Sequence, residues 1–279
     1  MSDLVIGSDG FLGKTISNIA LPKTIFVSRN PSSKSEENIF VDLTNIDSIS
    51  ETLQRYKIKR VFNLAGTFTN DFYEDFQANV NLTKNLLEAV VSVNKSIRIL
   101  LVGSSAEYGL VEPCECPVSE SAELKPASIY ALTKVYQTKL MEYYVSRFDL
   151  NVVMARIFNL LGHNCSDKLF VGRLYSQIKL FKDSKIDMIK LGNLSAMRDY
   201  IKVEDASKHL FKIMDCGTSG QIYNVASGVP IKIETLLKDI LKEEGVSLKH
   251  VLADDNRSNM SDAEMIYADI TKLKGLYND

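Results

Sequence analysis

Short apolar runs alternate with longer segments of helical periodicity along the chain as far as residue 158. Apolar side chains recur every three to four residues over 71–93 and again over 130–148, which predicts two long helices. Another helix is expected to open near residues 13–14. Strands are predicted at 4–6, 24–28, 39–41, 60–64, 97–102 and 152–157, with 223–225 as the last. This alternation indicates βαβ units around a parallel sheet.

Beyond residue 158 the expected elements become shorter and less regular. We therefore expect an α/β fold, a Rossmann-type doubly wound parallel sheet with a smaller C-terminal substrate-binding lobe. The dinucleotide-binding domain is predicted over residues 1–158, with a returning segment at about 199–225. The substrate-binding lobe is predicted to consist of residues 159–198 and 226–279.

Three glycines, Gly7, Gly10 and Gly13, follow the first predicted strand and lead into the first helix. Glycine permits a tight turn and lets the backbone approach a ligand closely. At this place in a βαβ unit, such a turn presents amide groups at a helix N-terminus to a pyrophosphate. The pattern therefore predicts a dinucleotide-binding site.

The end of the second predicted strand bears on which dinucleotide binds. An acidic residue there accepts hydrogen bonds from the ribose 2′-hydroxyl of NAD, whereas an arginine accommodates the 2′-phosphate of NADP. Ser28 and Arg29 stand at this place without a carboxylate, and a guanidinium suits a phosphate. NADP(H) is therefore preferred, with NAD(H) as the alternative. Asp42, after the third strand, is either an acceptor for the adenine amino group or the cap of a turn.

Tyr130 and Lys134 stand four residues apart on a predicted helix, so they share one face. A nearby ammonium group favours the phenolate, so we expect Lys134 to lower the pKa of Tyr130 from about 10 towards neutrality, where proton exchange with a substrate oxygen is effective. Ser104 and Ser105 follow the strand at 97–102, at the edge where parallel sheets bind ligands. One of these hydroxyl groups is expected to hydrogen-bond the reacting oxygen.

Composition narrows the classes of function. The 279 residues carry a formal net charge of -2, which argues against nucleic acid as a partner. No apolar run approaches the roughly 20 residues of a bilayer span, and no signal peptide is expected, so we expect a cytoplasmic protein without a membrane partner. The 4 cysteines and 3 histidines form no ligand pattern, so no metal site is expected.

Taken together, these residues resemble the extended short-chain dehydrogenase/reductase family, in its nucleotide-sugar-modifying branch, over essentially the whole chain. The glycine turn, Tyr130 with Lys134, and the serines before Tyr108-Gly109 occur in the order typical of that family. Further matching motifs are Asp42-Leu43, Asn63-Leu64-Ala65-Gly66, Asn79, Asn85-Leu86-Leu87-Glu88-Ala89, Arg156-Ile157-Phe158-Asn159, Arg198-Asp199-Tyr200, Tyr223-Asn224-Val225 and Tyr267-Ala268-Asp269.

The resemblance implies roles for individual residues. Tyr130 would be the acid/base, Lys134 would tune it and hold the nicotinamide ribose, and Ser104, assisted by Ser105, would bind the reacting oxygen. The dinucleotide would be held by Gly7, Gly10, Phe11, Leu12, Gly13, Ser28, Arg29, Asp42, Leu43, Leu64, Ala65, Gly66, Asn79, Tyr130, Lys134 and Ile157. A nucleotide-sugar substrate would contact Ser104, Glu107, Asn159, Asn193, Arg198 and Arg257.

Within the family, the segment 191–200 looks most like the group of GDP-mannose dehydratases and GDP-4-keto-6-deoxymannose reductases. A dehydratase needs a carboxylate two residues after the catalytic serine, where this chain has Ala106. NADPH-dependent reduction of a 4-keto-6-deoxyhexose is therefore expected, although Glu107, one position on, could substitute for the missing carboxylate. A nucleotide-sugar 4-epimerase with bound NAD and a non-catalytic dinucleotide-binding protein are the alternatives.

The resemblance also implies a homodimer. Its interface would be formed by the helices over 71–93 and 130–148. Packing of the same apolar faces into the core is the alternative explanation.

Overall fold

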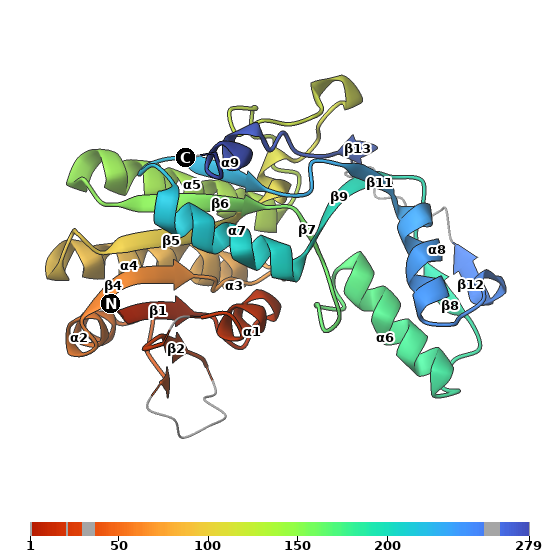
Figure 1. The fold of residues 1–279 in the computed structure, drawn as a ribbon, viewed down its shortest axis with the longest axis horizontal. Helices are drawn as coiled ribbons and strands as arrows, with labels where there is room; N and C mark the ends of the chain where they lie inside the picture. Colours follow the sequence, from red (N-terminus) through yellow and green to blue (C-terminus); the bar gives the residue numbers. More distant parts are fainter. Residues whose placement is uncertain (1, 21, 30–36, 254–262, 279) are drawn as a thin grey trace.

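The computed structural model describes residues 2–20, 22–29, 37–253 and 263–278. At its centre lies a seven-stranded parallel sheet with the order β10-β6-β5-β4-β1-β2-β3 (Figure 1). Its strands are β1 (Ser2–Ile6), β2 (Ile25–Val27), β3 (Asn38–Ile39), β4 (Ile58–Asn63), β5 (Arg98–Ser104), β6 (Val152–Ile157) and β10 (Ile222–Val225). The expected Rossmann-type fold is confirmed.

Helices cover both faces of the sheet. One face packs against α2 (Ile46–Arg55), α4 (Leu82–Val93) and α5 (Ile129–Phe148), and the other against α1 (Phe11–Ser17), α7 (Val203–Cys216) and α9 (Thr271–Gly275). Successive side chains of a strand point to opposite faces. Leu4 and Ile6 accordingly belong to the first apolar cluster and Val5 to the second. The strands therefore read as continuous apolar runs because both faces are buried.

The helix predicted over 71–93 is divided into three pieces. It begins as α3 (Phe72–Phe76), widens into a π-helical segment (Gln77–Asn81) and continues as α4. Asp71 caps its beginning by accepting a hydrogen bond from the Glu74 N–H at 2.9 Å. The wide turn brings Asn79 to a fully buried position.

Shorter elements form the second part of the molecule, on the right of Figure 1. Strand β9 (Met197–Lys202) pairs with β7 (Asn159–Leu161), β11 (Pro230–Lys232) and β13 (Met265–Ile266), and β8 (Ile189–Leu191) pairs with β12 (Val251–Ala253). Helices α6 (Phe170–Lys182) and α8 (Ile233–Glu243) pack on an apolar cluster with β8. The expectation that 223–225 is the last strand is wrong, because the two- and three-residue strands β11, β12 and β13 follow it.

Three short 3₁₀ helices complete the described elements: Ser105–Tyr108, Pro113–Glu115 and Leu248–His250. Near the end of the chain, α9 returns to the central sheet, where Leu273 and Leu276 pack with α7. The division into 1–158 with 199–225, and 159–198 with 226–279, remains a prediction. Within the described parts of the chain, no helix combines the length and hydropathy of a bilayer span.

Candidate active site

The glycine turn connects β1 to α1 at the carboxyl edge of the sheet. Gly7 has a φ of +86°, and a Cβ there would lie 2.9 Å from the backbone nitrogen of Ala65. A Cβ on Gly13 would lie 2.4 Å from the Gly7 carbonyl oxygen, so α1 approaches β1 as closely as it does only with glycine at this position. At the exposed Gly10, the only described atom that a Cβ would meet within 4 Å is that carbonyl oxygen, at 3.3 Å, so Gly10 borders open space.

Ser104, Tyr130 and Lys134 are brought together at the same edge. Ser104 ends β5, and the other two lie on the first turns of α5, whose beginning Ser128 caps. The Ser104 hydroxyl lies close enough to the Tyr130 hydroxyl to act on the pKa of Tyr130. The Lys134 Nζ lies 5.9 Å from the centre of the Tyr130 ring. Ser105, partly buried, opens the 3₁₀ helix that follows Ser104.

Lys134 is held by the protein on two sides. Its Nζ donates to the Val102 carbonyl oxygen at 2.9 Å and to Gln137 Oε1 at 3.1 Å. Burial lowers the pKa of Lys134 to about 8, because desolvation disfavours the ammonium form. A Cβ on Gly66 would lie 2.7 Å from Asn79 Oδ1 and 3.4 Å from Lys134 Nζ. The backbone at Gly66 therefore lies directly against two residues expected to hold the dinucleotide.

The pKa of Tyr130 moves in the direction opposite to the expectation. Burial raises it to about 12, and the neighbouring Ser104 hydroxyl only partly opposes this. Lys134 is not among the groups that lower this pKa, and its ammonium group donates to Val102 and Gln137. In this structure Tyr130 is therefore a neutral phenol at neutral pH, the form that donates a proton.

The loop 67–70 covers Tyr130 and is organised by a carboxylate that sequence analysis missed. Asp75 accepts hydrogen bonds at 2.9 Å from the backbone and hydroxyl groups of Thr69, from the Thr67 hydroxyl and from the Asn70 N–H. Burial acts to raise the pKa of this carboxyl, but the hydrogen bonds hold it below its usual value. Phe68, within the loop, makes an edge contact with the Tyr130 ring at 4.9 Å.

Glu107 does not face a substrate. It is fully buried, and its carboxylate accepts hydrogen bonds from the Ser104 N–H at 2.9 Å, Thr138 Oγ1 at 2.6 Å and Arg156 Nη2 at 2.9 Å. The expectations that Glu107 contacts the substrate and that it could replace the carboxylate of a dehydratase are therefore corrected. The pairing with Arg156 could not be foreseen because it joins residues 49 positions apart.

The residues expected near the adenosine end of the dinucleotide have mixed environments. Ser28 is buried at the end of β2, and its hydroxyl has no hydrogen-bond partner among the described residues. Arg29, next to it, is exposed. Asp42 Oδ1 accepts from the Thr44 N–H at 2.9 Å and the Thr44 hydroxyl at 2.6 Å, so Asp42 caps a turn, while its contact with the adenine amino group stays a prediction. Partly buried residues (Phe11, Leu43, Leu64, Ala65) and buried ones (Leu12, Ile157) complete this set.

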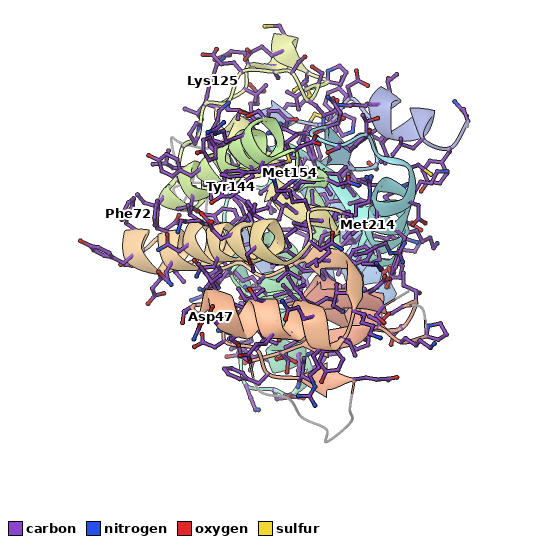
Figure 2. The ribbon with its side chains drawn as sticks, turned by 90° about the vertical axis from the view of Figure 1, so that its left-hand side faces the viewer. Asp47, Phe72, Lys125, Tyr144, Met154 and Met214 are labelled. Carbon is purple, nitrogen blue, oxygen red and sulfur yellow. The ribbon has the colours of Figure 1, made fainter. Side chains whose placement is uncertain are left out.

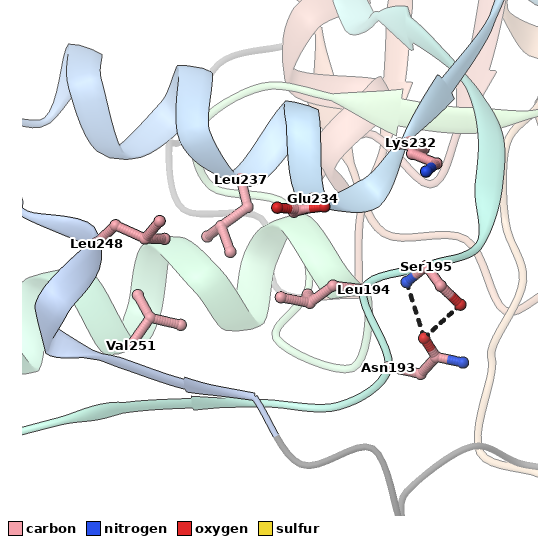
Figure 3. Close-up of a pocket in the computed structure, with 8 residues that line it drawn as sticks. All are labelled: Asn193, Leu194, Ser195, Lys232, Glu234, Leu237, Leu248 and Val251. Carbon is pink, nitrogen blue, oxygen red and sulfur yellow. Dashed lines mark hydrogen bonds between the residues drawn. The ribbon is translucent and has the colours of Figure 1, made fainter.

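The expected substrate contacts are spread over the second part of the molecule. Asn159 Nδ2 donates to the Asp199 carbonyl oxygen at 3.0 Å, and Arg198 Nη1 to the Met197 carbonyl oxygen at 2.9 Å. Asn193 accepts from Ser195 and lines a pocket of about 430 Å³ between the loop 193–195, α8 and β12 (Figure 3). The structure does not bring Asn193 into contact with Tyr130. Arg257 lies outside the described residues.

Comparison with known proteins agrees with this arrangement. A model of the NAD dependent epimerase/dehydratase family matches residues 4–226. The GDP-6-deoxy-D-mannose reductase of Pseudomonas aeruginosa is 28% identical over 184 residues, which cover 64% of this chain and 60% of that protein. The GDP-6-deoxy-D-talose 4-dehydrogenase of Aggregatibacter actinomycetemcomitans is 28% identical over 242 residues, 82% of this chain and 75% of the relative.

Solved structures support the fold. RMD from Pseudomonas aeruginosa, complexed with NADPH, superimposes with a TM-score of 0.85 at 23% identity, covering 100% of this chain and 93% of that one. The UDP-glucose 4-epimerase of Thermus thermophilus, in complex with NAD, gives 0.84 at 20% identity, with 99% and 92% covered. Because the family model spans the glycine turn, Ser104, Tyr130 and Lys134, the chain belongs to the NAD dependent epimerase/dehydratase family and is a nicotinamide-dinucleotide-dependent oxidoreductase of the short-chain dehydrogenase/reductase type.

Proposed function

We propose that this nucleotide-sugar-modifying enzyme is a cytosolic reductase that uses NADPH to reduce the C4 keto group of a nucleotide-linked 4-keto-6-deoxyhexose. The observation that carries the proposal is that the described residues just after Ser104 offer no available carboxylate. Ala106 occupies the position where an elimination needs an acid, and Glu107 is already bound by Thr138 and Arg156. The similarity to the Pseudomonas reductase supports the same reaction.

The residues of the chain fit a nicotinamide dinucleotide. Gly10 borders open space at the glycine turn, and the buried Ser28 hydroxyl, without a partner among the described residues, offers a hydrogen bond at the end of β2. Gly7, Gly10 and Gly13 would hold the pyrophosphate, Ser28 and Arg29 the adenosine end, and Gly66, Asn79 and Lys134 the nicotinamide end. When bound, the reduced cofactor supplies the hydride.

The chain's own contribution is the proton and the hydrogen bonds around the reacting oxygen. Tyr130 is a neutral phenol at neutral pH because burial raises its pKa to about 12, so it can donate a proton to the developing alkoxide. The Ser104 hydroxyl stabilises the same oxygen. Lys134, with a pKa of about 8, is mostly protonated at neutral pH and adds positive charge on this side of the site.

The experiment that tests the function is incubation with a panel of nucleotide-linked 4-keto-6-deoxy sugars, including GDP-4-keto-6-deoxymannose, and NADPH. The expected result is oxidation of one NADPH per sugar reduced. The absorbance of NADPH measures this oxidation, and analysis of the product gives the configuration at C4. A 4-epimerase would instead copurify with tightly bound NAD and convert its substrate without net oxidation. A protein that binds NADPH and turns over none of the panel would contradict the reductase.

Replacing Arg29 by alanine is expected to weaken NADPH binding about 10- to 100-fold, the loss typical of one charge-assisted contact to a phosphate, with NADH binding nearly unchanged. Arg29 is exposed at the end of β2, so the change should not affect the fold. Titration of both dinucleotides by fluorescence gives the two affinities. Arg55→Ala, which removes an arginine from α2, is the matched control. Equal weakening of both dinucleotides by Arg29→Ala would contradict a role in selecting the 2′-phosphate.

We further propose that two copies of the chain associate through α3 and α5. Aromatic side chains lie exposed on these helices: Phe72 is 43% exposed, Tyr73 82% and Tyr136 42%. Their rings continue through Phe76, which stacks on Phe72 at 5.4 Å and contacts Tyr136 at 5.9 Å. Figure 2 shows Phe72 at the outer edge of this helical layer. Apolar surfaces of this kind are typical of protein interfaces.

Introducing charge into this surface should separate the dimer. The double variant Tyr73→Glu with Tyr136→Glu is expected to sediment as a monomer at concentrations where the unmodified chain sediments as a dimer, because burying a carboxylate without a partner is costly. Sedimentation velocity provides the measurement. Phe40→Glu, at a side chain that is 62% exposed outside α3 and α5, is the control. A monomeric unmodified chain would reject the proposed association.

A further inference from the structure

Glu107 connects three elements that meet behind Ser104 and Tyr130. Its Oε1 accepts from the Ser104 N–H at 2.9 Å, at the end of β5. Its Oε2 accepts from the Thr138 hydroxyl at 2.6 Å, on α5, and from Arg156 Nη2 at 2.9 Å, on β6. Glu107 and Arg156 are 0% and 1% exposed. One buried carboxylate therefore ties the strand end that carries Ser104 to the helix that carries Tyr130.

Thr138, which links Glu107 to α5, lies on the same face of this helix as Tyr130 and Lys134. Residues four apart on an α-helix lie one above the other on the same face. Thr138 stands four residues after Lys134, which in turn stands four residues after Tyr130, and both Thr138 and Lys134 are buried. The Glu107 carboxylate therefore connects the backbone of Ser104 to the helix face that carries Tyr130.

Stability alone is a poor explanation for this ion pair. Burying two charges costs several kcal/mol of desolvation, and a well-packed apolar pair of similar volume is often equally stable. The Nε and Nη1 atoms of Arg156 have no hydrogen-bond partner among the described residues, which adds to the cost. An apolar pair, however, could not accept the Ser104 N–H. The carboxylate supplies an orientation that packing does not.

The guanidinium is itself fixed in place. It lies over the ring of Tyr108, with Cζ 4.7 Å from the ring centre, and the Tyr108 hydroxyl donates to Asn224 Oδ1 at 2.7 Å, on β10. The position of Glu107 is thus set by buried side chains from β6 and β10 as well as by its own short helix. Such a surrounding network is what holds a functional group within a fraction of an ångström of its working position.

We propose that Glu107 is a positioning residue for the reaction. Its carboxylate is anchored by Arg156 and linked to α5 through Thr138, and it holds the Ser104 hydroxyl in place relative to the Tyr130 hydroxyl. The inference rests on the proposed function, in which Ser104 and Tyr130 share the reacting oxygen. This role replaces the substrate binding that the sequence led us to expect of Glu107. The buried carboxylate would contribute to the reduction without contacting the substrate.

The kinetic test uses Thr138→Val, because Glu107→Gln leaves Arg156 buried without its partner and risks unfolding. With GDP-4-keto-6-deoxymannose and NADPH, Thr138→Val is expected to lower kcat about 10-fold with KM unchanged, since small displacements of a catalytic group cost up to about 100-fold. Ser104→Ala is expected to lower kcat about 100-fold. The double variant should remain near 100-fold, because groups that act through one another are not additive.

Two further variants separate positioning from a general weakening of the fold. Thr138→Ser restores the hydroxyl group and should recover kcat to within about twofold, as expected when only the hydrogen bond is at issue. Thr52→Val, at a buried threonine of α2 that donates to the Ser48 carbonyl oxygen at 2.8 Å, should leave kcat unchanged. If Thr138→Val and Ser104→Ala multiply to about 1,000-fold in the double variant, the two residues act independently and the proposal is overturned.

A measurement without substrate keeps this result distinct from failure of the reductase assignment. In protein labelled with carbon-13 at tyrosine Cζ, the resonance of Tyr130 is identified by its loss in Tyr130→Phe and reports how close the Ser104 hydroxyl lies to the phenol. Ser104→Ala and Thr138→Val should shift it in the same direction, and Thr138→Ser should restore it. An inactive but unmodified chain rejects the reductase only, whereas an unshifted resonance in Thr138→Val rejects the positioning role.

Discussion

Replacing Tyr130 by phenylalanine is expected to lower kcat about 1,000-fold, within the range typical for the loss of a general acid. The variant removes only the hydroxyl group, and the ring can keep its edge contact with Phe68 at 4.9 Å. Steady-state oxidation of NADPH in the presence of the keto sugar measures the loss. The affinity for NADPH, measured by fluorescence, should change little, because the ring and Lys134 stay in place.

The control for Tyr130→Phe is Tyr143→Phe, further along α5, at a side chain that is 54% exposed. It should leave kcat unchanged. If Tyr130→Phe retained more than a tenth of the activity, the proton would have to come from another group. A joint loss of NADPH affinity would point instead to a disturbed cofactor site.

Replacing Glu107 by glutamine is expected to destabilise the folded chain by about 3–5 kcal/mol, the cost of removing one partner from a buried ion pair. The amide cannot neutralise Arg156, which is 1% exposed and therefore has no access to water. Urea unfolding followed by circular dichroism measures the effect. The midpoint should fall while the slope of the transition stays the same, because the area exposed on unfolding does not change.

An exposed ion pair offers the matched control. Glu115 accepts a hydrogen bond from Lys125 Nζ at 3.0 Å, but both side chains are about 40% exposed. Water and salt screen such a pair, so Glu115→Gln should leave the urea midpoint unchanged. Equal midpoints for Glu107→Gln and Glu115→Gln would contradict the expected cost of leaving Arg156 buried without its partner.

The central sheet could be predicted because its strands are buried on both faces. The run 152–157 is apolar at nearly every position, and all six residues of β6 are buried as expected. The short strands β11, β12 and β13 carry no such signal, because two or three residues show no periodicity and their pairing depends on partners far along the chain. Helix α2 was not predicted, although Asn45 caps it by accepting from the Asp47 and Ser48 N–H groups.

The candidate site likewise contains residues that could be predicted from sequence and residues whose environment could not. Spacing on one helix, or a strand end followed by polar residues, is local, so Tyr130, Lys134 and Ser104 could be identified from sequence. The environment of Glu107 depends on Arg156 and Thr138, which the fold alone brings to it. The pKa of Tyr130 was predicted in the wrong direction for a related reason. The spacing of the two residues placed Lys134 beside the phenol. It could not reveal that Tyr130 is buried or that the Lys134 ammonium group donates to the Val102 carbonyl oxygen.

The π-helical segment at Gln77–Asn81 determines how α3 is rotated about the helix axis relative to α4. Tyr73 points outward, 82% exposed, while Asn79 turns inward and donates to Thr133 Oγ1 at 3.0 Å. Deleting one residue from this segment would restore ordinary α-helical winding and rotate α3 by about 100° relative to α4. Either the aromatic rings would no longer face outward or the Asn79 amide would no longer face inward, so both orientations depend on the length of this segment as well as on its side chains.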